Sequence, residues 1–210
     1  DFTATNGTSV VLAVGATAGD ELLFKVWSTL SLASTTLPNL TVTGNATLAG
    51  LMDISASTAG QIKFPATQNA SADANTLDDY EEGTFTPEIS GTSTAGSGTY
   101  SIQKGTYVKV GKLVTFQIYL TWSAHTGTGN MEITGLPFAP TGTTNVYWGV
   151  SIGYANNIAL TAGNILTAFT DANTAKITLQ QVSTGGGASS AVPIDTAGSI
   201  IISGSYTAYS

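Results

Sequence analysis

A run of acidic side chains is the first feature of the sequence that could carry chemistry. Residues 73–88 hold six of the thirteen acids of the chain, namely Asp73, Asp78, Asp79, Glu81, Glu82 and Glu88. Glycoside hydrolysis uses two carboxyl groups about 5–10 Å apart across the scissile bond. Neighbouring acids in a solvated connector meet this spacing without a pocket, so we expect residues 73–88 to be an acidic junction. A glycan hydrolase or lyase that uses Asp78, Asp79, Glu81 or Glu82 is the alternative.

The same segment offers oxygen ligands of the kind that Ca²⁺ binds, from Asp73, Asn75, Asp78 and Asp79. The order of an EF-hand loop is absent, because no glycine stands at the sixth position and no glutamate at the twelfth. A transition-metal site lacks ligands as well, since the chain has no cysteine and His125 is its single histidine. We therefore expect neither a metal ion nor a cofactor.

The single histidine is also the residue that could act as the base of a catalytic triad. A triad needs a serine on a nucleophile elbow, and no Gly-x-Ser-x-Gly sequence occurs. The glycines at 185–187 lack the lysine and hydroxyl residue of a phosphate-binding loop. His125 lies in the polar stretch 124–129, which predicts a surface position. Together these features predict a protein that is not an enzyme.

Aromatic rings exposed beside polar loops are typical of sugar-binding surfaces. Tyr147 and Trp148 are neighbours in one expected strand and must point to opposite faces. One of the two rings therefore faces away from the core and is a candidate for ligand contact, although packing against a neighbouring subunit explains it equally well. The loops 124–130, 140–145 and 184–190 are candidates too. The receptor-binding candidates are His125, Thr143, Tyr147, Trp148 and Tyr154.

Composition narrows the classes of protein that the 210 residues can form. All six basic residues are lysines and the formal net charge is −7, so a polyanion such as nucleic acid is repelled. With 42% hydrophobic residues the chain is too apolar for a disordered protein. It has no apolar stretch of about 18 residues, which predicts no membrane insertion. The chain begins at Asp1 without a methionine, as expected of a processed protein or a piece of a longer one.

β-branched and aromatic residues dominate the second half of the chain and favour strands. Alternation is clearest where Val114, Phe116, Ile118, Leu120 and Trp122 share one face of an expected strand. Further strands are expected at residues 84–90, 99–110, 131–134, 146–154, 165–169, 176–182 and 199–207. Their spacing predicts an antiparallel β-sandwich of the jelly-roll kind as a C-terminal head over residues 89–210.

Two smaller parts are expected before this head. Residues 1–36 predict a small β module that is too short to sustain a core alone. Within residues 37–72, Val42, Leu48 and Ile54 recur every six residues, which is typical of a short β-helical or intertwined shaft. Such turns bury almost nothing in one chain but form a continuous core between three copies, so a homotrimer is expected. A chance period in an ordinary linker is the alternative.

Five blocks of the sequence carry a resemblance to a known family. They are Gly60-Gln-Ile-Lys-Phe-Pro-Ala-Thr-Gln68, Ser71-Ala-Asp-Ala-Asn-Thr-Leu-Asp-Asp-Tyr-Glu-Glu-Gly-Thr-Phe-Thr-Pro87, Gly105-Thr-Tyr-Val-Lys-Val-Gly111, Ile133-Thr-Gly-Leu-Pro-Phe138 and the opening Asp1-Phe-Thr-Ala-Thr-Asn-Gly-Thr-Ser-Val-Val-Leu12. These blocks resemble tail fibre proteins of bacteriophages and prophages, notably those of marine and cyanobacterial hosts. The last seventy residues resemble no family in this way.

The resemblance implies an all-β, homotrimeric fibre on the extracellular face of a virion tail. It implies that other virion tail proteins are partners and that the terminal head binds a polysaccharide or lipopolysaccharide of the host surface. No catalytic residues come with it. A non-adhesive connector or collar protein of the virion is an alternative, and so is a bacterial surface adhesin built from similar modules.

Overall fold

The computed structural model describes residues 2–3, 11–12, 43–44, 46, 49–52, 60–142 and 145–209. The chain divides into two compact units, residues 1–56 and 57–210. In the first unit, β1 (Phe2–Thr3) pairs antiparallel with β2 (Val11–Leu12). The chain also bends at residues 43–44 and 49–50, which hold glycines of the expected six-residue period. The apolar positions of that period, Val42, Leu48 and Ile54, lie outside the described residues, so the shaft stays a prediction.

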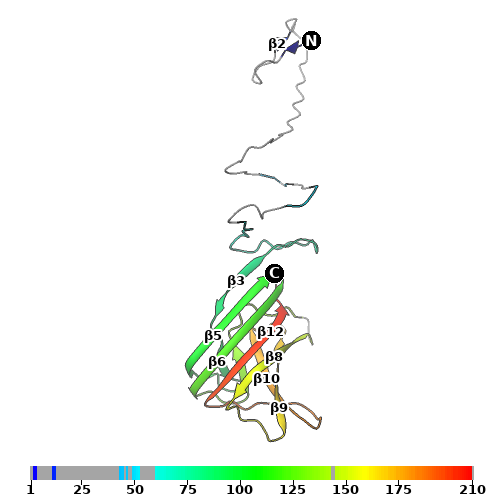
Figure 1. Cartoon of the computed structure of the whole chain (residues 1–210). Helices are drawn as coiled ribbons and strands as arrows, with labels where there is room; N and C mark the ends of the chain where they lie inside the picture. Colours follow the sequence, from blue (N-terminus) through cyan, green and yellow to red (C-terminus); the bar gives the residue numbers. More distant parts are fainter. Residues whose placement is uncertain are drawn as a thin grey trace. The chain divides into compact units, whose positions relative to one another are not determined.

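The second unit is built around one ten-stranded antiparallel sheet (Figure 1). Its strand order is β3-β5-β6-β12-β8-β9-β10-β7-β4, and β11 pairs with β10 outside this path. The described part of the chain contains no helix. The strands are β3 (Tyr80–Phe85), β4 (Glu88–Gly91), β5 (Gly98–Val110), β6 (Leu113–His125), β7 (Met131–Thr134), β8 (Tyr147–Asn156), β9 (Asn164–Asp171), β10 (Lys176–Ser183), β11 (Ser190–Ala191) and β12 (Gly198–Thr207).

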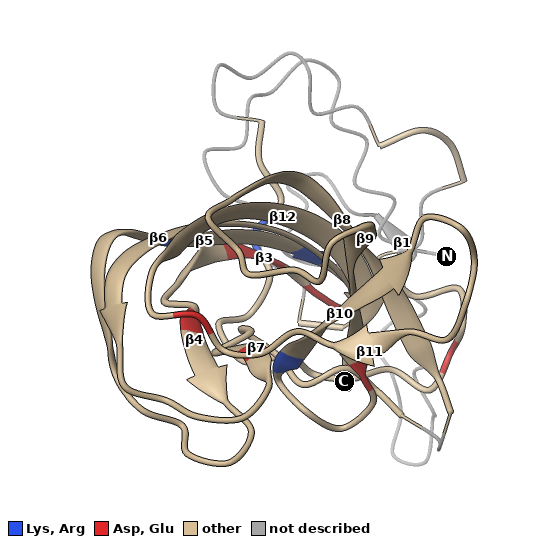
Figure 2. Ribbon diagram, turned by 90° about the horizontal axis from the view of Figure 1, so that it is seen from below, with Lys and Arg blue, Asp and Glu red and all other residues tan. Residues whose placement is uncertain are grey.

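The sheet curls into a half-barrel, so the fold is all-β as expected, while the expected jelly-roll sandwich is not confirmed. Figure 2 shows the strands passing around one interior, from β5 and β6 to β10, β7 and β4. The two edge strands, β3 and β4, are separated in the chain by Thr86 and Pro87 alone. Because proline has no backbone N–H, the ladder of β3 cannot continue through it into β4. The short connection holds the two edges of the sheet near each other.

Side chains of β5 bridge these two edges. The backbone N–H of Ile89 donates a hydrogen bond to the Tyr100 hydroxyl oxygen at 2.8 Å, and Gln103 Nε2 donates to the Pro87 carbonyl at 3.1 Å. Strand β3 also begins at Tyr80, inside the segment expected to be a connector. The acidic run is therefore partly an edge of the sheet and not a free linker.

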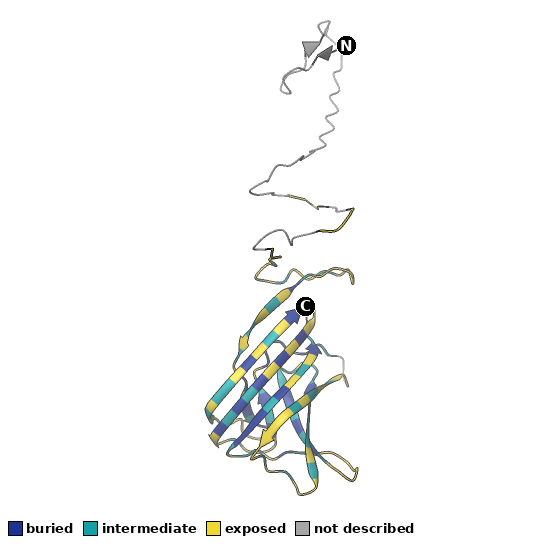
Figure 3. Ribbon diagram, in the orientation of Figure 1, coloured by how far each residue is buried: buried dark blue, intermediate teal, exposed yellow. Residues whose placement is uncertain are grey.

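The core of the half-barrel is the inner face of the sheet. Along β6 every second side chain from Val114 to Trp122 is buried, as the alternation predicts, and Figure 3 shows how buried and exposed residues are distributed over the other strands. Ile118 lies opposite Ile202, and Leu120 lies opposite Ile200, so β6 and β12 form the centre of the core. Each such side chain contributes about 1.5–3 kcal/mol by burial. The expected face of Val114, Phe116, Ile118, Leu120 and Trp122 is buried throughout.

A bulge supports the curvature of the sheet. The register between β12 and β8 shifts between Ile201 and Ile202, and Gly153 of β8 is left without an opposite residue. A bulge bends its strand and increases the local right-handed twist. The sheet can therefore turn between β12 and β8 while both strands keep their inner faces on the core.

Candidate functional site

The acidic residues that could form a hydrolase site are engaged in other contacts. Asp79 is buried and forms an ion pair with Lys109 of β5. Glu81 and Glu82 are consecutive in β3, so their side chains lie on opposite faces of the sheet. Two carboxyl groups on opposite faces cannot flank one scissile bond, and the pair expected from the sequence is not formed by these two residues.

The glutamates of β3 each accept a hydrogen bond from a tyrosine. The Tyr107 hydroxyl group donates to Glu81 Oε1, and the Tyr80 hydroxyl group donates to Glu82 Oε2 at 2.9 Å. Burial and the neighbouring Glu81 carboxylate raise the pKa of Tyr107 to about 12. The bond to Glu81 joins β5 to β3, whereas the bond to Glu82 lies within β3, so both glutamates act as structural acceptors.

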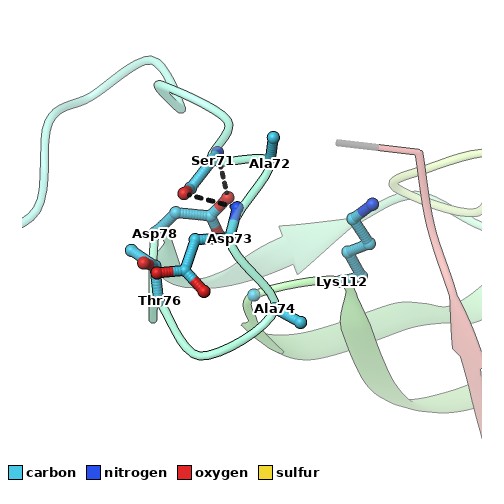
Figure 4. Close-up of a pocket in the computed structure, with 8 residues that line it drawn as sticks. Ser71, Ala72, Asp73, Ala74, Thr76, Asp78 and Lys112 are labelled. Atoms are coloured by element: carbon cyan, nitrogen blue, oxygen red, sulfur yellow. Dashed lines mark hydrogen bonds between the residues drawn. The ribbon is translucent and has the colours of Figure 1, made fainter.

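Asp73 and Asp78, two of the aspartates considered as calcium ligands, line a solvent-facing hollow of about 400 Å³ (Figure 4). Asp78 Oδ2 accepts the backbone N–H of Ser71 at 2.8 Å, and the N–H of Asp73 donates to Ser71 Oγ at 3.1 Å. The hydrogen bond from Ser71 lowers the pKa of Asp78. Within residues 60–142 and 145–209, no three residues of the types His, Cys, Asp and Glu gather as ligands for one metal ion.

His125 is buried, which corrects the expected surface position. Its Nε2 lies 2.9 Å from the Ile89 carbonyl oxygen, and its Nδ1 accepts the backbone N–H of Gly127 at 3.0 Å. Nε2 thus joins the end of β6 to β4, and Nδ1 holds the loop that follows β6. The ring fixes the fold at this end of the sheet and has no nitrogen left for a ligand.

The aromatic residues of β8 are arranged as the strand pattern requires. The Tyr147 ring is 57% exposed on the outer face, whereas Trp148 is half-buried against the core. Tyr147 packs edge to face on Phe169 of β9, with ring centroids 5.2 Å apart. Tyr154 is exposed near the other end of β8. Thr143 lies outside the described residues.

A pocket of about 430 Å³ opens at the rim of the half-barrel where β8 begins and β12 ends. We call it the rim pocket. Its walls combine the rings of Trp148 and Tyr209, the side chain of Val146 and two threonines, and none of them carries a charge. The lining residues are Thr141, Gly142, Val146, Trp148, Thr207 and Tyr209.

Hydrogen bonds hold the wall of the rim pocket that the 134–147 connection forms. The backbone N–H of Thr141 donates to the Thr207 carbonyl oxygen at 2.7 Å, and the two threonine hydroxyl groups lie 2.9 Å apart. Asn173 donates from its backbone N–H to the Pro140 carbonyl at 2.9 Å and from Nδ2 to the Gly142 carbonyl at 3.2 Å. These bonds fix the loop at residues 140–142 against the end of β12 and the β9–β10 turn.

Two backbone features make this arrangement possible. A Cβ atom at Gly142 would lie 1.9 Å from the Cβ of Ala172, so only glycine allows the loop to approach the β9–β10 turn this closely. Asn173 has a φ of 64°, in the left-handed region that asparagine tolerates better than most residues. Gly142 in the loop and Asn173 in the turn thus allow the two segments to pack together beside the pocket.

The rim pocket can bind an uncharged ligand with apolar faces and polar edges. Aromatic rings stack on the apolar C–H faces of sugars, and threonine hydroxyl and backbone groups can hydrogen-bond their edges. The sequence named the loop 140–145 and Trp148 as candidates but missed Thr207 and Tyr209. The alternation at the end of the chain could have indicated them. Tyr206 and Ala208 are buried, so Thr207 and Tyr209, which alternate with them, face outward.

The observed fold is that of an all-β protein with a curled antiparallel sheet. No family model matches the chain, and no curated protein matches it. Among solved structures, the chain is similar to a crystal structure of the Dettilon tailspike protein, with 24% sequence identity and a TM-score of 0.48. This similarity covers 60% of the present chain and 23% of the tailspike chain.

One prediction is corrected by this comparison. The sequence predicts that the protein is not an enzyme, whereas the similar solved structure is a tailspike, and tailspikes often degrade glycans. The prediction is therefore wrong and is not kept. The residues that the structure describes give no positive evidence for an activity either.

No helix among the described residues is long and apolar enough to cross a membrane.

Proposed function

We propose that this chain is a protein of a phage tail that binds an uncharged sugar of the host surface through the rim pocket. The observation that carries the proposal is the composition of that pocket. Trp148 and Tyr209 provide two aromatic walls, and Thr141 and Thr207, whose hydroxyl groups lie 2.9 Å apart, line the same pocket. Stacking on rings of this kind is the usual way in which proteins bind the apolar face of a sugar.

The charge of the pocket supports a neutral sugar over an acidic one. None of the described residues that line it is charged, and the whole chain has a net charge of −7. A sulfated or carboxylated glycan would meet a repulsive protein without a local cation to offset the repulsion. Affinity for one sugar unit is expected to be weak, because a shallow pocket removes only part of a ligand from water.

The proposed place in a virion tail rests on the sequence blocks that resemble tail fibres. These blocks extend through β3, β5 and β7 and end at Phe138, and the rim pocket is built almost entirely from later residues. A common framework with a different rim for each host is consistent with this division. Other virion tail proteins are the proposed partners of the remaining parts of the chain.

We further propose that the protein acts as a homotrimer. Apolar side chains are exposed together on the outer face of β3, β5 and β6, where Tyr80 lies opposite Val110 and Val110 lies opposite Leu113. Val108 extends the group along β5. Contiguous exposed apolar residues are typical of an interface. Three weak sugar sites on one particle would bind a cell surface together far more tightly than one.

The oligomeric state is tested by sedimentation equilibrium of the full chain. A mass three times that of the monomer supports the trimer, and Val110→Lys, which places a charge in the exposed apolar group, is expected to shift the mass toward the monomer. Thr106→Lys, at another exposed position of β5, is the control. A monomer at all concentrations would contradict the proposal.

The binding function is tested with an array of bacterial surface polysaccharides and lipopolysaccharides. The full chain is expected to bind a subset of neutral glycans, with no loss at high salt, because the pocket uses no charge. Binding that is restricted to acidic glycans and abolished by salt would contradict the proposed site. Failure to bind any glycan would favour the non-adhesive connector.

A further inference from the structure

A buried ion pair between Lys109 and Asp79 lies on the inner face of the half-barrel, and Glu81 is on the same face. Lys109 points inward from β5, and its Nζ contacts the Oδ2 atom of Asp79. Asp79 is the residue just before β3. The lysine side chain is 2% exposed and the aspartate side chain 6%. Glu81 lies directly opposite Lys109 in the ladder between β3 and β5, two residues from Asp79 and therefore on the same face.

The surroundings of the lysine are aromatic and nearly free of water. The Phe138 ring centroid lies 5.4 Å from Lys109 Nζ, and Tyr107 packs edge to face on the same ring at 5.4 Å. One polar neighbour completes the group: Lys109 Nζ donates to Gln68 Oε1 at 3.1 Å. In such a medium each ion has lost most of the water that would hydrate it.

We propose that Lys109 and Asp79 react after folding to form an intramolecular amide bond between Nζ and Cγ. The ammonium group first transfers a proton to the Asp79 carboxylate, which leaves a neutral amine beside a neutral carboxylic acid. The amine lone pair then attacks Cγ and forms a C–N bond. The C–O bond to one Asp79 oxygen breaks, and this oxygen leaves with two protons as water.

The step needs a group that moves a proton from nitrogen to the leaving oxygen. Glu81 is the carboxyl group placed for this role, because it lies opposite the lysine and on the face of the aspartate. No oxidation state changes and no cofactor or second substrate is used. The product is one amide and one water molecule, and the remaining N–H of the amide keeps the hydrogen bond to Gln68.

The position of this bond gives it a mechanical consequence. Asp79 is 30 residues from Lys109 in the chain, and it stands where the chain enters the edge strand β3. Without the amide, a pull on the chain before Asp79 would peel β3 from β5 one hydrogen bond at a time. With the amide, the same pull passes directly to β5, which is paired on both sides.

The intact mass of the purified full chain tests the proposal. The expected mass is lower than the sequence mass by one water molecule, and digestion is expected to give one branched peptide that contains both residues. Trypsin is expected to leave the bond after Lys109 uncut. Lys104→Arg, at an exposed position of the same strand, is the control and should keep the loss of water.

Variants distinguish the Lys109–Asp79 amide from other reactions that would also lower the mass by one water molecule. Lys109→Arg is expected to restore the full mass, and Asp79→Asn is expected to lose one ammonia in place of one water. Glu81→Gln should retain the full mass for longer after folding. A folded wild-type chain with the full sequence mass would overturn the proposal, even if none of the variants folds. A loss of water that persists in Lys109→Arg would overturn it as well.

Discussion

The Tyr209 hydroxyl group donates a hydrogen bond to Asn173 Oδ1 at 2.5 Å, and the backbone N–H of Gly142 approaches the same hydroxyl oxygen at 3.5 Å. This contact joins the end of the last strand to the β9–β10 turn and to the 134–147 connection. The Tyr209 ring is thereby held at the mouth of the rim pocket although it is 57% exposed. An aromatic ring that is fixed before binding loses little entropy when a ligand stacks on it.

Asn173 is expected to matter through both its backbone and its side chain. Asn173→Gly keeps the left-handed backbone but loses the hydrogen bonds to Gly142 and Tyr209, which costs about 0.5–1.5 kcal/mol. Asn173→Ala loses the same bonds and adds roughly 1–2 kcal/mol for the backbone. Urea unfolding of both variants measures the difference. Equal stability of the two would show that the left-handed backbone does not determine the cost.

A methyl group at Gly142 is expected to disturb the wall of the rim pocket. Gly142→Ala places a Cβ against Ala172 and should lower the free energy of unfolding by about 1–3 kcal/mol. Gly149→Ala is the matched control, because nothing lies within 4 Å of its added Cβ. Thermal melts of the two variants provide the measurement. The close approach at Gly142 is disproved if both melt at the same temperature.

The buried histidine is expected to be a structural residue. His125→Ala leaves the Ile89 carbonyl and the Gly127 N–H without their partner, which costs about 1–3 kcal/mol. Gln117→Ala, at an exposed position of the same strand, should change stability little. Chemical unfolding measures both, and glycan binding of folded His125→Ala should be unchanged. Loss of binding without loss of stability would return His125 to the binding candidates.

Stability is expected to fall at alkaline pH because of Tyr107. The pKa of this residue is raised from about 10 in the unfolded chain to about 12 by burial and by Glu81. The neutral form is therefore stabilised by folding, and its contribution is complete below pH about 10 and is lost as the pH rises toward 12. Tyr107→Phe should make the free energy of unfolding depend less on pH within this window. An unchanged dependence would contradict the shift.

Much of the sheet could be predicted from the sequence because one face of each strand is buried. The alternation from Val114 to Trp122 defines β6 without reference to any other strand, and the expected ranges 131–134, 176–182 and 199–207 agree with β7, β10 and β12. A period of two shows which face is inward but not which strands are neighbours. One curled sheet and two stacked sheets therefore have the same sequence pattern, and for this reason the all-β class is confirmed while the sandwich is not.

The candidate site was predictable in part. The alternation of Tyr147 and Trp148 shows that one ring faces outward, and the structure identifies Tyr147 as that ring. The polar surroundings of His125 predicted exposure, yet the ring is buried by a contact with β4, which lies 36 residues away in the chain. Long-range contacts of this kind leave no local signal. The contact of Thr207 with Thr141 across the rim is of the same kind, although the alternation around Thr207 shows which way its side chain faces.

The central claim is that the rim pocket binds sugar, and calorimetric titration with the best glycan from the array tests it most directly. Tyr209→Ala is expected to weaken binding roughly tenfold, which corresponds to about 1.4 kcal/mol. Tyr209→Phe keeps the ring and should retain most of the affinity. Tyr154→Ala removes an exposed tyrosine from the other end of β8 and should bind as the wild type does. Equal affinity of Tyr209→Ala and the wild type, or a loss confined to Tyr154→Ala, would contradict the proposed site.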